Sequence, residues 1–114
     1  MRLLTKSIEK KLRANHAEAI EADGKMIDHK PVVKIFGGSS FTFLATELDD
    51  DNVLYGLADL GFGTPEIGYT AFSEIAAKRF PPFGLGPERD RGFKAKKTLV
   101  EYANEAREVG MIQA

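Results

Sequence analysis

Charged side chains near the ends of several extended segments have the types and spacing that acid–base or metal chemistry would need. The candidates are five carboxylates and one guanidinium: Glu47, Asp59, Glu66, Glu88, Arg89 and Asp90. Two carboxylates in one site can exchange a proton or hold a divalent ion when burial raises the pKa of one of them. Asp59 and Glu66 flank one predicted turn and can lie near each other, whereas Glu47 should lie at the opposite end of the sheet. We take these six residues as candidate binding residues; carboxylates at strand ends are also common as turn caps.

The run Glu88-Arg89-Asp90-Arg91 alternates in charge inside an aromatic-rich segment. Ion pairs and forked arginine contacts that pin the segment onto the body are the favoured interpretation. A charged recognition surface is the alternative.

Other motifs that can carry chemistry are incomplete. His16 and His29 have no serine or cysteine nucleophile pattern beside them, and the absence of cysteine excludes thiolate zinc sites. The glycines at 37–38 and 61–63 fall between two strands, so they predict turns; a phosphate loop would lead into a helix. The acidic stretch 49–52 lacks the context of a calcium loop and predicts a hairpin tip. The sequence thus indicates no catalytic residue, no cofactor and no metal site.

Charge gives no sign of a nucleic-acid partner. The chain carries 16 basic and 17 acidic residues, for a net charge of −1, whereas nucleic-acid-binding domains usually show a basic excess. Aromatic side chains could form a base-stacking platform: Phe36, Phe41, Phe43, Tyr55 and Tyr69. Acidic residues are interleaved with them, so we favour a core role and expect a protein partner.

Size and composition predict a single domain over residues 1–114. The N-terminus moves straight into charged residues, and no apolar stretch approaches the length of a signal peptide or a membrane span. We therefore expect a cytoplasmic protein without membrane contact. The sequence does not indicate an oligomeric state.

Four strand-like segments with short turns between them indicate the fold class. They cover residues 32–36, 41–48, 53–60 and 66–72. Short connections force neighbouring strands to be antiparallel. We expect a four-stranded antiparallel meander, with apolar side chains on both faces of the second strand.

Three helices should pack on this sheet. One is predicted over 6–22 and a short one from Ser73, which would cap it. A third begins at the capping box Thr98 to Glu101 and ends at Gly110. Between the last two, Phe80, Phe83, Leu85 and Phe93 should pin an irregular segment to the body. The predicted class is α+β, with an N-terminal, a short middle and a C-terminal helix covering one sheet face.

Several segments together resemble a bacterial family of about 110 residues whose domain is of unknown function. They are Leu3-Leu4-Thr5-Lys6, Thr46-Glu47-Leu48-Asp49, Tyr55-Gly56-Leu57-Ala58-Asp59, Glu66-Ile67-Gly68-Tyr69 and Gly84-Leu85-Gly86-Pro87-Glu88-Arg89-Asp90. The chain departs from the family's pattern where phenylalanines replace an expected tryptophan in the second strand. The resemblance implies an origin on plasmids, phages or integrative elements and carries no catalytic residue.

From these observations we expect an accessory protein of a mobile element that binds a macromolecular partner, such as an inhibitor of a host defence system. The alternative is a carboxylate- or metal-dependent enzyme, or a binder, acting on nucleic acid or nucleotide. That alternative requires Asp59, Glu66 and the segment 88–90 to converge.

Overall fold

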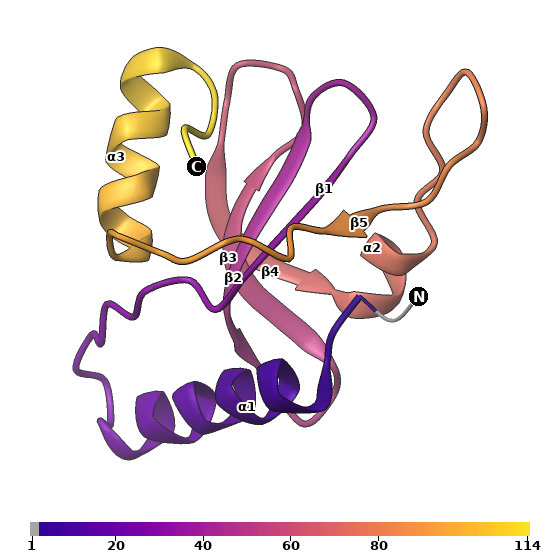
Figure 1. The fold of residues 1–114 in the computed structure, drawn as a ribbon. Helices are drawn as coiled ribbons and strands as arrows, with labels where there is room; N and C mark the ends of the chain where they lie inside the picture. Colours follow the sequence, from indigo (N-terminus) through magenta and orange to yellow (C-terminus); the bar gives the residue numbers. More distant parts are fainter. Residues whose placement is uncertain (1–2) are drawn as a thin grey trace.

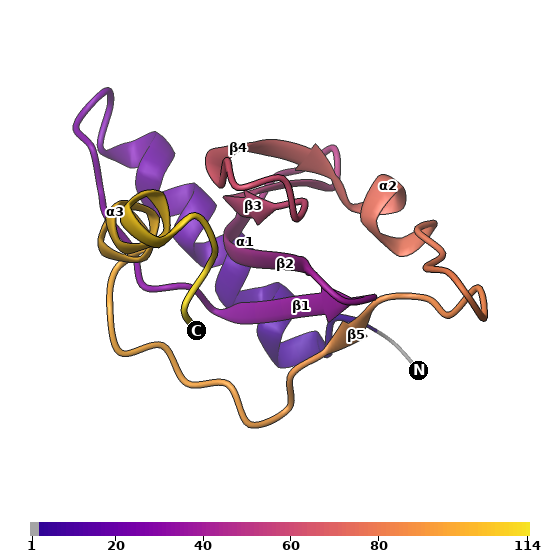
Figure 2. The same cartoon turned by 90° about the horizontal axis from the view of Figure 1, so that it is seen from above.

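The computed structural model describes residues 3–114 and is built around one antiparallel sheet (Figure 1). The strands follow the order β4-β3-β2-β1-β5 across the sheet (Figure 2). Their bounds are β1 Val33–Gly37, β2 Phe41–Leu48, β3 Val53–Asp59, β4 Glu66–Ala71 and β5 Glu88–Arg89. The helices are α1 Lys6–Glu21, α2 Phe72–Ala76 and α3 Leu99–Val109. No helix within residues 3–114 is long and apolar enough to span a membrane.

The α+β class and the antiparallel meander β1 to β4 are confirmed, but the prediction of four strands was wrong. A fifth strand, β5, pairs with β1 through Ile35 opposite Arg89 and Phe36 opposite Glu88. Two charged residues are too few to show the alternation by which a strand is recognised. The segment predicted as an irregular loop therefore closes one edge of the sheet.

Helices cover both faces of the sheet, and the expectation that they share one face was wrong (Figure 2). On one face, Leu12 of α1 and Ile75 of α2 pack with Phe43 and Leu54 of the sheet. On the other face, α3 packs on Leu44 and Leu57 with residues that include Leu99, Tyr102, Ala103 and Ala106. Alternate residues of β2 thus supply two separate cores, as the apolar side chains on both of its faces had indicated.

Two of the three predicted helix starts are confirmed. The hydroxyl of Thr5 accepts from the amide of Ile8 at 3.1 Å and begins α1. The capping box of Thr98 and Glu101 begins α3, and Gly110 ends it with a φ of 89°. For α2 the prediction of a Ser73 cap was wrong, since the helix begins one residue earlier and Ala71 holds the cap position without a side-chain hydrogen bond.

A β-bulge lies between β2 and β3. The pairing shifts between Ala45, which faces Gly56, and Glu47, which faces Tyr55. A Cβ atom on Gly56 would lie 2.1 Å from the carbonyl oxygen of Leu44, so only glycine permits this approach of the two backbones. The bulge shifts the alternation of β2 by one residue and sets the face on which Glu47 lies.

Candidate functional site

The candidate charged residues do not form one site. Glu66 begins the edge strand β4 and Glu88 lies on the opposite edge strand β5. Four inter-strand spacings separate these strands, roughly 19 Å. Asp59, on β3, lies roughly 14 Å from β5 by the same measure. The convergence that a carboxylate- or metal-dependent enzyme would need is not met, and residues 3–114 hold no cluster of three metal-ligating side chains.

Asp59 and Glu66 also point to opposite faces, although they flank one turn. Glu66 faces Ala58 across the β3–β4 pair and therefore shares its face. The next residue, Asp59, points to the α3 face. Its carboxylate is buried there and accepts from the amides of Gly61 at 2.9 Å and Ile112 at 3.0 Å. The observed role of Asp59 is to join the sheet to the C-terminal tail.

Glu47 lies at the other end of the meander from Asp59, as expected, because Thr42 at the start of β2 faces Asp59. The carboxylate of Glu47 lies 3.2 Å from Nδ1 of His16 on α1. Glu47 also lines a small pocket beside α3, which is described below.

The segment of alternating charges anchors two distant parts of the chain. Arg89 donates from Nη1 to the carbonyl oxygen of Leu3 at 3.0 Å. The carboxylate of Asp90 lies 3.7 Å from the ammonium of Lys34 and also accepts from the amide of Gly92 at 2.9 Å. The favoured pinning role is supported for Arg89 and Asp90, while Glu88 lines a surface hollow.

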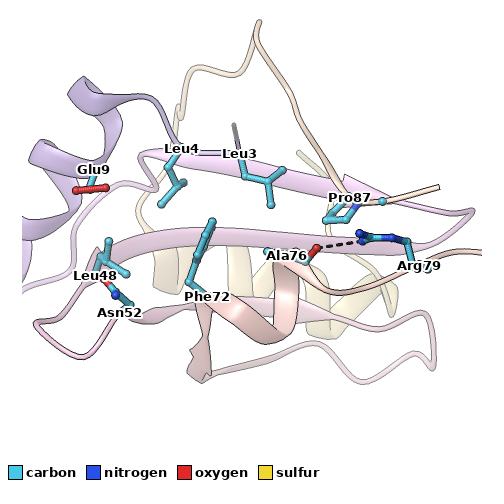
Figure 3. Close-up of a pocket in the computed structure, with 10 residues that line it drawn as sticks. Leu3, Leu4, Glu9, Leu48, Asn52, Phe72, Ala76, Arg79 and Pro87 are labelled. Carbon is cyan, nitrogen blue, oxygen red and sulfur yellow. Dashed lines mark hydrogen bonds between the residues drawn. The ribbon is translucent and has the colours of Figure 1, made fainter. Parts of the chain in front are cut away.

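An apolar groove lies on the α1–α2 face (Figure 3). Its volume is about 600 Å³. Leu3 and Leu4 form one side, and Phe72 points toward them from the start of α2 on the other side (Figure 3). Pro87 and Arg79 lie at one end and Glu9 at the other. The side chains thus offer an apolar strip with a cation and an anion at its ends.

Two smaller hollows continue this groove along the segment 79–88. The first shares Leu3, Gly86 and Pro87 with the groove, and the second shares Leu85, Gly86 and Glu88 with the first. We call the three together the 79–88 surface. Its lining includes Leu3, Leu4, Phe72, Arg79, Phe83, Leu85, Pro87 and Glu88. Hollows that run one into the next along a segment can take an extended chain.

Part of this surface projects from the body. The segment between α2 and β5 forms a loop that extends beyond the sheet (Figure 1). At its base Phe80 stacks on Phe41, with ring centroids 5.8 Å apart. Phe83 at the tip is 82% exposed and Leu85 is 66% exposed. The expectation of pinning is confirmed for Phe80 and Phe93, which pack on the two cores, and was wrong for Phe83 and Leu85.

The sequence analysis did not identify the apolar residues of this surface, because its candidate site residues were all charged. Leu3 and Leu4 belong to the segments that resemble the family, but no function was predicted for them. Phe83 and Leu85 are expected from the sequence to pin their segment to the body, because large apolar side chains are usually buried. Their signal was the spacing of prolines and glycines around them, which marks a tight loop with little room to turn every side chain inward.

The comparisons with known proteins place the chain in a family without adding an activity. It belongs to the family described as a protein of unknown function, DUF2958, whose model matches residues 3–113. No curated protein and no solved structure matches the chain.

Proposed function

We propose that this member of the DUF2958 family is an accessory protein that acts by binding a protein partner through the 79–88 surface. The occupant we infer is an extended segment of the partner with apolar side chains. The observation that carries the proposal is the continuity of three hollows past two exposed apolar side chains, Phe83 and Leu85.

Burial energetics support this assignment. Full burial of a large apolar side chain stabilises a complex by about 1.5–3 kcal/mol relative to exposure. Phe83 and Leu85 gain nothing comparable in the free protein, because most of their surface faces solvent. Binding a partner segment would cover both side chains together with the partly buried ring of Phe72. Leu3 and Leu4 are already nearly buried and would form the floor of the groove.

Specificity would come from the ends of the groove. Arg79 uses Nη1 to donate to the carbonyl oxygens of Ala76 at 3.1 Å and Lys78 at 2.6 Å, which fixes its guanidinium at the rim. A carboxylate on the partner segment near Arg79 would complement this charge. Glu9, at the opposite end, lies 3.5 Å from Arg13. A basic residue of the partner that replaces Arg13 in this ion pair would set the direction of the bound segment.

The host context that we propose is a plasmid, phage or integrative element. This part rests on the family resemblance. In that setting the partner would be a protein of a host defence system, and occupation of the 79–88 surface would inhibit it.

Copurification tests the proposal. The tagged protein, a Phe83→Ser/Leu85→Ser variant and a Phe62→Ser control would be isolated from native lysates under several buffer conditions. Phe62 is as exposed as Phe83 but lies in the β3–β4 turn and lines none of the three hollows. We expect one protein to be retained by the wild type and the control and lost from the double variant. No stable partner under any condition, or equal retention by all three proteins, would refute the proposal.

A further inference from the structure

A separate hollow lies on the opposite face of the sheet, between the α1–β1 connection, three strands and the start of α3. We call it the tyrosine pocket; its volume is about 190 Å³. The lining residues that matter here are Lys25, Asp28, His29, Glu47, Tyr55 and Tyr69. The pocket shares no lining residue with the 79–88 surface, so it needs a role of its own.

Three lining side chains form a row across the sheet. Glu47 on β2 faces Tyr55 on β3, and Tyr55 faces Tyr69 on β4. The two tyrosine rings lie 4.9 Å apart between centroids and are tilted by 51°. Tyr69 is 74% exposed although it neighbours an apolar ring, which leaves much of its surface open to an occupant.

His29, in the α1–β1 connection, lines the same pocket. The side chain of His29 is 13% exposed, and its Nε2 lies 3.5 Å from a carboxylate oxygen of Glu18. Both of its ring nitrogens are buried, yet neither has a hydrogen-bond partner within residues 3–114. Most buried polar atoms in proteins have such partners. An occupant of the pocket that offers a hydrogen-bonding group would supply one.

The charges around the pocket are mainly negative. Glu47 and Asp28 line it from two elements, and Lys25 is the cation among the described lining residues. Glu18 lies outside the lining, against His29, and Glu47 also contacts His16. Burial raises the pKa of Tyr55, and so do Tyr69, Glu47 and Asp28. The same negative potential that opposes ionisation of this phenol favours a positive guest. Aromatic faces attract cations as well.

We propose that the tyrosine pocket binds a small organic cation, an alkylammonium group that contacts the rings of Tyr55 and Tyr69 and pairs with the carboxylate of Glu47. The two sources of such a group are a free amine and the side chain of a lysine in another protein. Both present the same chemistry to the pocket.

The chain provides its own reporter for this site. It contains three tyrosines and no tryptophan, and two of the three tyrosines line the pocket. Titration with n-butylammonium should therefore change the intrinsic tyrosine fluorescence to saturation, with a dissociation constant of about 1 mM, weak because the ligand has few atoms. n-Butanol at matched concentrations is the neutral control. Nα-acetyl-lysine N-methylamide, which presents the ammonium from a peptide backbone, shows by tighter or weaker binding which source the pocket prefers.

Two variants connect the signal to the pocket. Tyr69→Leu removes an exposed ring and leaves the cores untouched, and Glu47→Gln removes the charge. Each should weaken binding about tenfold or more, corresponding to about 1.4 kcal/mol, as followed by the shift of ligand NMR signals. Glu66→Gln, an exposed carboxylate on the other face, should leave binding unchanged. Absence of saturation with both ammonium compounds, or equal response to n-butanol, would overturn the proposal, as would unchanged binding in Tyr69→Leu.

Discussion

The buried carboxylate of Asp59 accepts a hydrogen bond at 3.0 Å from the amide of Ile112, which is 53 positions further along the chain. Its second oxygen accepts from Gly61 in the turn that follows β3. One side chain thus holds both the β3–β4 turn and the C-terminal tail, and Ile112 is carried into the core beneath α3. Asp59, a candidate site residue by sequence, therefore stabilises the fold.

Replacing Asp59 should therefore reduce stability. Asp59→Ala leaves two amides without their acceptor and should lower the free energy of unfolding by about 2–3 kcal/mol. Asp59→Asn keeps one acceptor and should cost about 1–2 kcal/mol. Urea denaturation followed by circular dichroism measures both values. Glu66→Gln is the control and should change stability by no more than about 0.5 kcal/mol; a similar loss in that variant would contradict the assigned role.

Gly56 and Gly68 face each other on β3 and β4 and should respond oppositely to alanine. The Cβ of Gly56→Ala would meet the backbone of Leu44 and Ala45, so we expect a loss of about 3 kcal/mol or more. A Cβ on Gly68 meets nothing within 4 Å, and alanine there should be neutral or stabilising by about 0.5 kcal/mol. Thermal unfolding of the two variants measures both changes in stability. Equal changes would contradict the close contact of the β2 and β3 backbones at Gly56.

Glu101 should make the free energy of unfolding depend on pH in the acidic range. The backbone amide of Thr98, then its side chain, then Lys97 and Lys30 hold the pKa of Glu101 below its ordinary value of 4.5. A lowered pKa in the folded state stabilises the protein above the ordinary pKa, and this contribution is lost as the pH falls toward the folded value. The difference in unfolding free energy between wild type and Glu101→Gln should thus be largest near neutral pH and shrink below pH 4.5. A difference that grows in acid would contradict the capping role.

Phe80 lies at the anchored base of the projecting loop and Phe83 at its exposed tip, so the two residues should differ in their effect on stability. Phe80 stacks on Phe41 and fills the space beside Gly37 and Gly38, so Phe80→Ala should lower stability by about 2 kcal/mol. Phe83→Ala should change it by less than about 0.5 kcal/mol, because the ring is exposed. Denaturant midpoints decide between these values, and a large loss at Phe83 would mean that its ring is held by the body.

Patterns with strong local rules predicted the fold well. Short turns specified the antiparallel meander, and the Thr98–Glu101 box with Gly110 specified α3 at both ends. The rest depends on contacts between distant residues. β5 forms through backbone pairing of Arg89 with Ile35, which is far away in the sequence. The apolar residues on both faces of β2 allow helices on both sides, but they do not show that α3 packs on the face opposite α1.

The candidate residues show the same limit. Spacing correctly placed Glu47 and Asp59 at opposite ends of the meander, because register follows from turn length. It could not show that Glu66 and Asp59 point to opposite faces, or that β5 would take Glu88 to the far edge of the sheet. Charge patterns also could not predict that Arg89 donates to the carbonyl oxygen of Leu3, 86 positions earlier in the chain. This contact holds Leu3 in the lining of the groove.

Site-specific photo-crosslinking in living cells tests the central claim most directly. A benzophenone amino acid would replace Phe83 on the 79–88 surface or, as the matched exposed control, Phe62 in the β3–β4 turn. We predict a covalent adduct of one defined size from position 83 that is absent from position 62 and disappears when Leu85→Ser removes the neighbouring exposed apolar side chain. Adducts of equal yield from both positions, or none from position 83, would contradict the account.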